Sequence, residues 1–218
     1  MKAILIKLLL FPALAIIVSC NSKPSYAELE NEVFQDIFPA LVDSVCIDRR
    51  ISWAIFDYYP GMESDSAKLA QSHKSLDIKI RRIKQDTANL VIAIADTLEA
   101  FDDYDAVKKE FEKRNLMPDT ISPEKIKFDV APYQGKTQYK FRYLSTFPDR
   151  YSIWGTNYDF NFAGVFSFSH IMFDTTKTFA VMEAGYMEGD LVGAGGVVFL
   201  EKRKGKWYIV EVINTWVS

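Results

Sequence analysis

The carboxyl-terminal part of this 218-residue chain constrains the fold most, because four successive runs there have the composition of strands. The runs cover residues 165–173, 179–186, 197–202 and 207–213, with polar turn segments at 174–177 and 203–206. Runs of about this length that are rich in β-branched and aromatic residues and bounded by turn residues are typical of strands, and short turns join antiparallel neighbours. The pattern predicts an antiparallel meander of three to four strands.

The amino-terminal half has helical periodicity instead. Ser25 and Glu28 have the spacing of a capping box, and apolar residues follow at intervals of four from residue 29 to residue 45. Pro39 lies inside this pattern and predicts a kink or a restart near Phe38, since proline removes a backbone donor and crowds the preceding turn. Further helices are expected over residues 64–85 and 105–114.

Shorter strand patterns occur between and after these helices. Residues 90–95 form an apolar run, which favours a buried strand, and residues 126–130 and 139–143 alternate with a period of two. Helices packed on one side of a mostly antiparallel sheet define the α+β class. We therefore predict a single α+β domain over residues 26–218.

Composition excludes several classes of protein. The apolar fraction of 49%, the charged fraction of 25% and the mean hydropathy of −0.05 are those of a globular domain and argue against disorder or a multi-pass membrane protein. The net charge of −3 provides no basic surface for nucleic acid, so no nucleic-acid partner is expected. Of the two cysteines, Cys46 is predicted to be a buried structural thiol.

The first twenty residues form a separate unit. Lys2 and Lys7 come before or at the start of an apolar stretch that runs from residue 8 to residue 18. A short basic region followed by about 7–15 apolar residues is typical of an export signal. The stretch ends in Ile17, Val18, Ser19 and Cys20. These residues resemble the lipobox of bacterial lipoproteins, in which an aliphatic residue, a small or aliphatic residue and a small residue precede the cysteine.

The lipobox resemblance implies cleavage between Ser19 and Cys20 and lipidation of the Cys20 sulfur. Residues 1–19 would be the signal peptide and residues 20–25 a tether. Each buried methylene of an acyl chain contributes about 0.8 kcal/mol, so more than one chain retains a protein at a bilayer. The expected location is the bacterial cell envelope, with the domain facing the periplasm or the outer surface. The alternative is an ordinary cleaved signal with a chance cysteine.

The carboxyl-terminal hairpin carries a second resemblance. Residues 199–212, FLEKRKGKWYIVEV, resemble the terminal hairpin of nuclear-transport-factor-like and ketosteroid-isomerase-like cone folds. They are also similar to the carboxyl-terminal part of uncharacterised envelope lipoproteins of Bacteroidetes type. The first resemblance implies a cone-shaped sheet with helices before the long strands.

Few residues suggest chemistry. His73 and His170 are the only histidines, and no metal-ligand spacing occurs, so we expect no metal and no cofactor. His170 shares a predicted strand face with Phe166, Phe168 and Met172 and could act as a base in a pocket, with Glu183 or Tyr186 from the neighbouring strand. The alternative is a half-buried histidine satisfied by one hydrogen bond.

Two further patterns bear on binding. Glycines between residues 185 and 196 are expected to permit tight turns, a bulge or a close approach of backbones. Aromatic residues gather in two turn regions and suit either a carbohydrate or protein contact surface or a lid on the core: Trp53, Tyr58, Tyr59, Tyr151, Trp154 and Tyr158. We predict an envelope-anchored binding or interaction module for a protein or glycan ligand, the alternative being a cone-fold hydrolase or isomerase that uses His170 and Glu183.

Overall fold

The computed structural model describes residues 23–58, 66–86, 89–119 and 125–218. Its helices are α1 (Tyr26–Val45), α2 (Arg49–Asp57), α3 (Ser66–Gln85) and α4 (Tyr104–Lys113), with short 3-10 turns at Ala131–Tyr133 and Leu144–Thr146. Its strands are β1 (Leu90–Ile94), β2 (Lys140–Tyr143), β3 (Asn161–Phe168), β4 (Met172–Phe173), β5 (Phe179–Gly189), β6 (Val192–Arg203) and β7 (Lys206–Val217).

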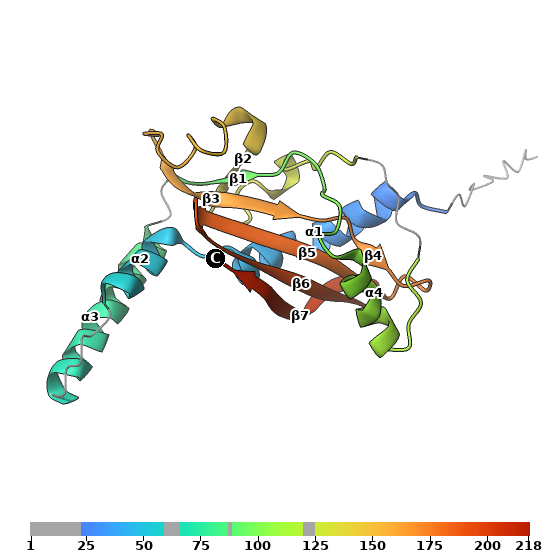
Figure 1. Cartoon of the computed structure of the whole chain (residues 1–218), viewed down its shortest axis with the longest axis horizontal. Coiled ribbons are helices and arrows are strands. Elements are labelled where there is room, and N and C mark those ends of the chain that lie inside the picture. Colours follow the sequence, from blue (N-terminus) through green and yellow to red (C-terminus); the bar gives the residue numbers. More distant parts are fainter. Residues whose placement is uncertain (1–22, 59–65, 87–88, 120–124) are drawn as a thin grey trace, which may run out of the picture.

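All seven strands belong to one open sheet of order β2-β1-β3-β5-β6-β7, with β4 also paired to β5 (Figure 1). The pairs β3–β5, β4–β5, β5–β6 and β6–β7 are antiparallel, which confirms the predicted meander. The buried run at Leu90–Ile94 is confirmed as a strand, and it pairs in parallel with both β2 and β3. The protein is therefore an α+β fold with a mixed sheet.

Helix α1 begins at the predicted capping box. The Ser25 backbone N–H donates to a Glu28 carboxylate oxygen at 2.7 Å, and the Glu28 N–H donates to the Ser25 hydroxyl at 3.3 Å. These bonds satisfy backbone donors that the first turn would otherwise leave unpaired. The helix continues through Pro39 to Val45 as one element, so the predicted restart near Phe38 does not occur.

The main core lies between α1 and one face of the sheet, which we call the α1 face. Phe38 is fully buried at its centre, with ring centroids 4.3 Å from Tyr133, 5.2 Å from Phe141 and 5.3 Å from Phe128. The buried positions of α1 recur every three to four residues, as the apolar stripe predicts. Aromatic packing of this kind contributes about 0.5–1.5 kcal/mol per pair beyond the area buried.

Helix α4 packs on the opposite face, which we call the α4 face (Figure 1). Val107 and Phe111 of α4 contact a smaller cluster that includes Val181 and Phe199 from β5 and β6. Arg114, which caps α4, lies over the Phe199 ring with 4.4 Å between the guanidinium carbon and the ring centroid. Because α4 is only ten residues long, it covers one end of this face.

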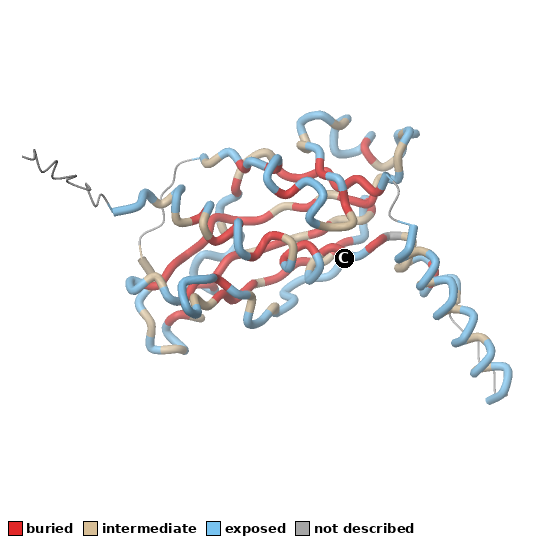
Figure 2. The backbone as a smooth tube through the Cα atoms, turned by 180° about the vertical axis from the view of Figure 1, so that it is seen from behind, coloured by how far each residue is buried: buried red, intermediate tan, exposed pale blue. Residues whose placement is uncertain are grey.

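Helices α2 and α3 form a hairpin that projects from the end of the sheet opposite the start of α1 (Figure 1). No residue of α3 is buried, and Figure 2 shows the hairpin as largely exposed. Arg50 fixes its base, because its guanidinium bonds Asp48 at 2.8 Å and Asp86 at 3.1 Å. The sequence pattern predicted α3 but did not predict α2.

Two predicted strands need correction. Residues 126–130 form no strand, and their only β-bridge joins Lys127 to Thr97. The predicted strand at 165–173 is interrupted, because the His170 N–H donates to the Glu99 carbonyl at 2.9 Å and not to a sheet neighbour. The Ser169 hydroxyl fills the gap by accepting the Glu183 N–H at 2.9 Å. The interruption separates β3 from β4.

Candidate functional site

A cavity of about 290 Å³ lies on the α4 face, beside the first turn of α4. We call it the α4 pocket. Its lining comes from the segment before α4, from α4 itself and from strands β3, β5, β6 and β7. The polar and aromatic residues that shape it are Glu99, Asp102, Asp103, Ser167, Glu183 and Trp216. Its volume is at the lower end of the range of about 300–1,000 Å³ for small-molecule sites.

Glu183 enters the pocket from β5. Its Oε2 accepts the Asp102 backbone N–H at 2.7 Å, which fixes the carboxylate next to the start of α4. Burial raises the pKa of Glu183, and the nearby Asp102 and Asp103 charges raise it further, although backbone N–H groups of the same two residues act in the opposite direction. Glu183 is thus a partly desolvated carboxyl group with a raised affinity for a proton.

Glu99 provides a second carboxyl group, on a residue that is more exposed than Glu183. Partial desolvation of the carboxyl raises its pKa, the charge of Asp102 adds to this effect, and a hydrogen bond with Ser167 opposes it. Both Glu99 and Glu183 line the α4 pocket. Two carboxyl groups in one cavity can exchange protons with a ligand or accept hydrogen bonds from its hydroxyl groups.

Trp216 forms one wall of the pocket, and glycines determine how it lies. Ser167, Gly185, Gly195 and Trp216 occupy one row across β3, β5, β6 and β7. A Cβ atom on Gly195 would lie 2.5 Å from two indole atoms and 2.6 Å from a third. A Cβ on Gly185 would lie 3.1 Å from the indole. The side chain therefore extends from β7 across β6 towards β5, in space that only glycine leaves open.

A Cβ on Gly196 would lie 2.1 Å from the Ile213 carbonyl oxygen, which confirms the close approach of backbones predicted for the glycines between residues 185 and 196. The indole remains accessible on its other side, because Trp216 is 37% exposed. A tryptophan that only packs in the core is buried, as Trp207 on the α1 face is, with 3% of its surface exposed. Trp216 is thus a supported aromatic surface that faces the pocket.

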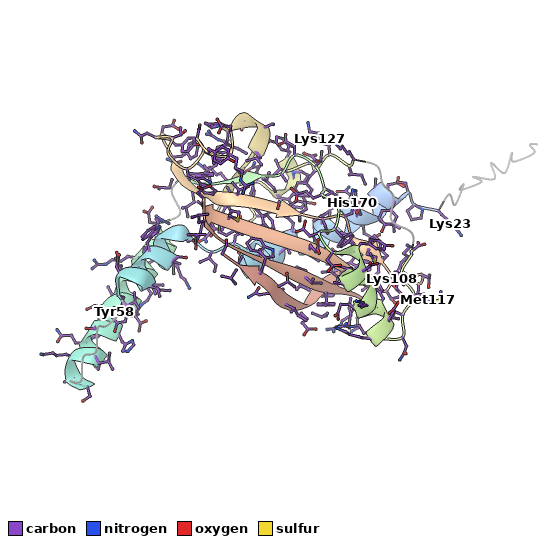
Figure 3. The ribbon with its side chains drawn as sticks, viewed as in Figure 1. Lys23, Tyr58, Lys108, Met117, Lys127 and His170 are labelled. Atoms are coloured by element: carbon purple, nitrogen blue, oxygen red, sulfur yellow. The ribbon has the colours of Figure 1, made fainter. Side chains whose placement is uncertain are left out.

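His170 lies on the other face of the sheet. Its Nδ1 is 3.1 Å from Oε1 of Glu30 on α1, and the same oxygen accepts the Ile171 N–H at 2.8 Å. His170 and Glu30 are both buried, and Figure 3 shows His170 beside α1. The position on the α1 face, with Phe166 and Phe168, is the one the alternation predicted.

Tyr186 also lies on the α1 face. Its hydroxyl donates to the Ala163 carbonyl at 2.6 Å, and burial raises its pKa. Glu183 and Tyr186 are three residues apart on one strand, so their side chains point to opposite faces. The structure therefore does not bring His170, Glu183 and Tyr186 into one pocket: only Glu183 lines the α4 pocket.

The second aromatic turn region lies near the base of the helical hairpin. A hollow of about 340 Å³ is lined there by Trp154 and Tyr158, together with Asp48 and Arg50. The Tyr158 ring stacks on Phe160 with 4.7 Å between centroids, and Trp154 contacts Phe162 at 5.3 Å. These rings are half-buried, whereas Tyr151 of the same region is 80% exposed. Of the first region, Trp53 is 51% exposed on α2, and Tyr59 lies outside the described residues.

Several predicted features concern metals and membranes. Cys46 is buried and free, and burial raises its pKa, as expected of a structural thiol. Within the described ranges, no three His, Cys, Asp or Glu side chains are grouped so that they could hold a metal ion. The helices in those ranges also contain no stretch that is long and apolar enough to span a bilayer. Ser19 and Cys20 lie outside the described residues.

Comparison with known proteins adds no relationship. No protein-family model matches the chain, and neither curated proteins nor solved structures give a significant match.

No pattern in the sequence indicated Glu99 or Trp216 as residues of a site. Counting from the hairpin turn, where Arg203 pairs with Lys206, would place Asn214 opposite Gly195. Two register shifts in the β6–β7 ladder move Trp216 into that position instead. The glycines at 185 and 195 were the available indication, because paired glycines in a hairpin leave room for a large neighbour.

Proposed function

We propose that the mature protein is a lipid-anchored binding component of a bacterial envelope and that its ligand occupies the α4 pocket. The lipobox pattern at residues 17–20 supports the anchor, with cleavage after Ser19 and lipidation of Cys20. The start of α1 at Tyr26 leaves six residues as the tether, so the domain begins close to the bilayer surface. The domain then faces the periplasm or the outer surface of the cell.

The observation that carries the binding function is the partly buried Glu183 carboxyl group beside an accessible indole, with the more exposed Glu99 in the same cavity. Partial burial of a carboxyl group costs free energy that apolar residues at the same positions would not cost. Glu183 bears this cost on a face where α4 could pack over an apolar surface, as it does at Val181 and Phe199. A group in a cavity that lowers the stability of the free protein indicates a binding site, because a bound ligand can provide its missing hydrogen-bond partner.

The alternative of a hydrolase or isomerase that uses His170 and Glu183 loses its main premise. An acid and a base that act on one substrate must both reach it within hydrogen-bonding distance or through one water. His170 pairs with Glu30 on the α1 face, whereas Glu183 lines the pocket on the α4 face. A binding function requires no such pairing and is the one we propose.

The anchor is tested by Cys20→Ser. We expect this variant to remain unprocessed and to lose lipid, because the thioether sulfur is absent. The measurement is the intact mass of the protein purified from membranes of the natural host, compared with wild type. A mature, membrane-bound Cys20→Ser protein of the same processed length would contradict the anchor.

The site is tested by Ala106→Phe. Ala106 lines the pocket from the exposed side of α4, so a phenyl ring there fills the cavity without entering the core. Lys108→Phe is the matched control, since Lys108 is exposed on the same helix and outside the lining (Figure 3). Wild type and Lys108→Phe should retain a compound from envelope extracts, detected by mass spectrometry, and Ala106→Phe should not. Equal retention by all three proteins would contradict the assignment of the pocket.

A further inference from the structure

We propose that the α4 pocket binds a saccharide, with one pyranose ring stacked on Trp216. This inference rests on the proposed function and names the chemical class of its ligand. A pyranose has a face of C–H groups that packs on an aromatic ring and a rim of hydroxyl groups that need hydrogen-bond partners. The α4 pocket provides an aromatic ring and polar groups in one cavity.

The orientation of Trp216 is the first argument. Three indole atoms, Cε2, Nε1 and Cζ2, are 2.5–2.6 Å from the position of a Cβ on Gly195. These three atoms are consecutive on the edge of the indole that carries Nε1, so this edge lies directly against the glycine. The rest of the ring is partly accessible, because Trp216 is 37% exposed, and it is this part that Trp216 can offer to a ligand. A flat ring on a rigid backbone support is preorganised, so binding costs little side-chain entropy.

The polar groups around the indole are the second argument. Glu183 and Glu99 present carboxyl oxygens to the pocket, and Ser167 and Thr215 contribute hydroxyl groups. Carboxylates accept hydrogen bonds from hydroxyl groups, and the bonds of an ionised acceptor are about twice as strong as neutral ones. A hydroxyl-rich ring can donate to the acceptor sites that these groups still have free, whereas an apolar ligand would cover those sites without pairing them.

The size of the cavity sets the length of saccharide that it encloses. A volume of about 290 Å³ suits one small ring and not a large cofactor. Further sugar residues of a chain would lie on the α4 face outside the pocket. We therefore expect oligosaccharides to bind at least as tightly as the monosaccharide.

The test is calorimetric titration of the soluble domain, residues 23–218, with defined saccharides. The probes are hexasaccharides of β-1,4-glucose, α-1,4-glucose, β-1,3-glucose, β-1,4-xylose and β-1,4-N-acetylglucosamine, together with the peptidoglycan disaccharide. At least one should bind wild type. Trp216→Ala should weaken binding at least about tenfold, and Trp216→Phe, which keeps a flat ring, about threefold or less. Tyr208→Ala is the control, because Tyr208 is an exposed aromatic of β7 outside the pocket.

Two results would contradict the proposal that the ligand is a saccharide. One is that no probe binds wild type, and the other is that binding is the same in Trp216→Ala as in wild type. The titration also includes lysine and ethanolamine, since carboxylates beside an indole can bind an ammonium group; tight binding of these amines without saccharide binding would replace the proposed class. Ala106→Phe could lose a compound that wild type retains although no saccharide binds. In that case the α4 pocket remains the proposed site, and only the saccharide as its ligand is contradicted.

Discussion

Gly195→Ala tests whether the Trp216 indole lies against Gly195, because this contact decides whether the substitution raises or lowers the free energy of unfolding. In a strand without close neighbours, alanine is more stable than glycine by about 0.5–1 kcal/mol, because the unfolded chain has less freedom to lose. At Gly195 the added Cβ would lie 2.5 Å from the indole, whereas comfortable contacts between carbon atoms are about 3.5–4.0 Å. The indole must move by about 1 Å or more, or leave the surface.

Overpacking of this size costs about 1–3 kcal/mol. After subtraction of the gain from alanine, we expect a net loss of about 1 kcal/mol, which lowers the Tm of a protein of this size by about 2–4 °C. Gly155→Ala is the control. Its Cβ would have a single neighbour, the Ser152 carbonyl oxygen at 4.0 Å, so the expected change is within about 0.5 kcal/mol.

The assay is thermal unfolding followed by circular dichroism, combined with tryptophan fluorescence. The Trp216 contribution is obtained by difference from Trp216→Phe, and in Gly195→Ala it should shift to longer wavelength as the indole turns towards water. The same variant should lose the retained ligand. A Tm equal to or above that of wild type, with an unchanged Trp216 spectrum, would refute the arrangement of the indole over the glycines.

Three further predictions concern the fold around the site. Asp174 is buried, which raises its pKa, but the Thr176 hydroxyl and the N–H groups of Phe179, Thr178 and Thr176 bring the pKa below its usual value. The charge of Asp174 therefore stabilises the fold above about pH 4, and this stabilisation is lost as the pH falls through the pKa of the folded state. The difference in Tm between wild type and Asp174→Asn should therefore become smaller in acid, and a difference that does not change with pH would contradict this. His170→Gln should lower the free energy of unfolding by about 1 kcal/mol, measured with denaturant, because the bond to Glu30 is altered. Ligand retention should not change, and a loss of retention would indicate that His170 belongs to the site. Ser25→Ala should cost about 1 kcal/mol by the same measurement, because the capping box is lost, and an unaltered midpoint would speak against it.

Local patterns in the sequence predicted the elements whose structure depends on near neighbours. The capping box at Ser25 and the apolar stripe behind it predicted α1, and the run at Leu90–Ile94 predicted β1. The prediction of a strand at 126–130 was wrong, because alternation shows only that a segment could form a strand. This segment forms a single β-bridge, between Lys127 and Thr97. That β1 pairs in parallel on both sides was not predictable from its residues, because parallel partners lie far away in the chain.

The candidate site was harder to predict because it depends on register. The interruption after Phe168 changes which side chains face the core, so that Met172 joins the cluster on the α4 face and Phe173 the one on the α1 face. The register shifts between β6 and β7 bring Trp216 opposite Gly195. A shift of one residue reverses the face of every later side chain, and no local pattern records it. Glu183 was found as a candidate, but its partners were not.

The location of the ligand is the central claim, and the indole signals of the four tryptophans in an NMR spectrum test it most directly. Each side chain reports on a different region: Trp216 on the α4 pocket, Trp154 on the second aromatic hollow, Trp53 on the helical hairpin and Trp207 on the core. On addition of the retained ligand, the Trp216 indole N–H and the Gly185 amide should shift most, and the Trp154 and Trp53 indoles should not move. Shifts confined to Trp154 or Trp53, with Trp216 unchanged, would contradict the account.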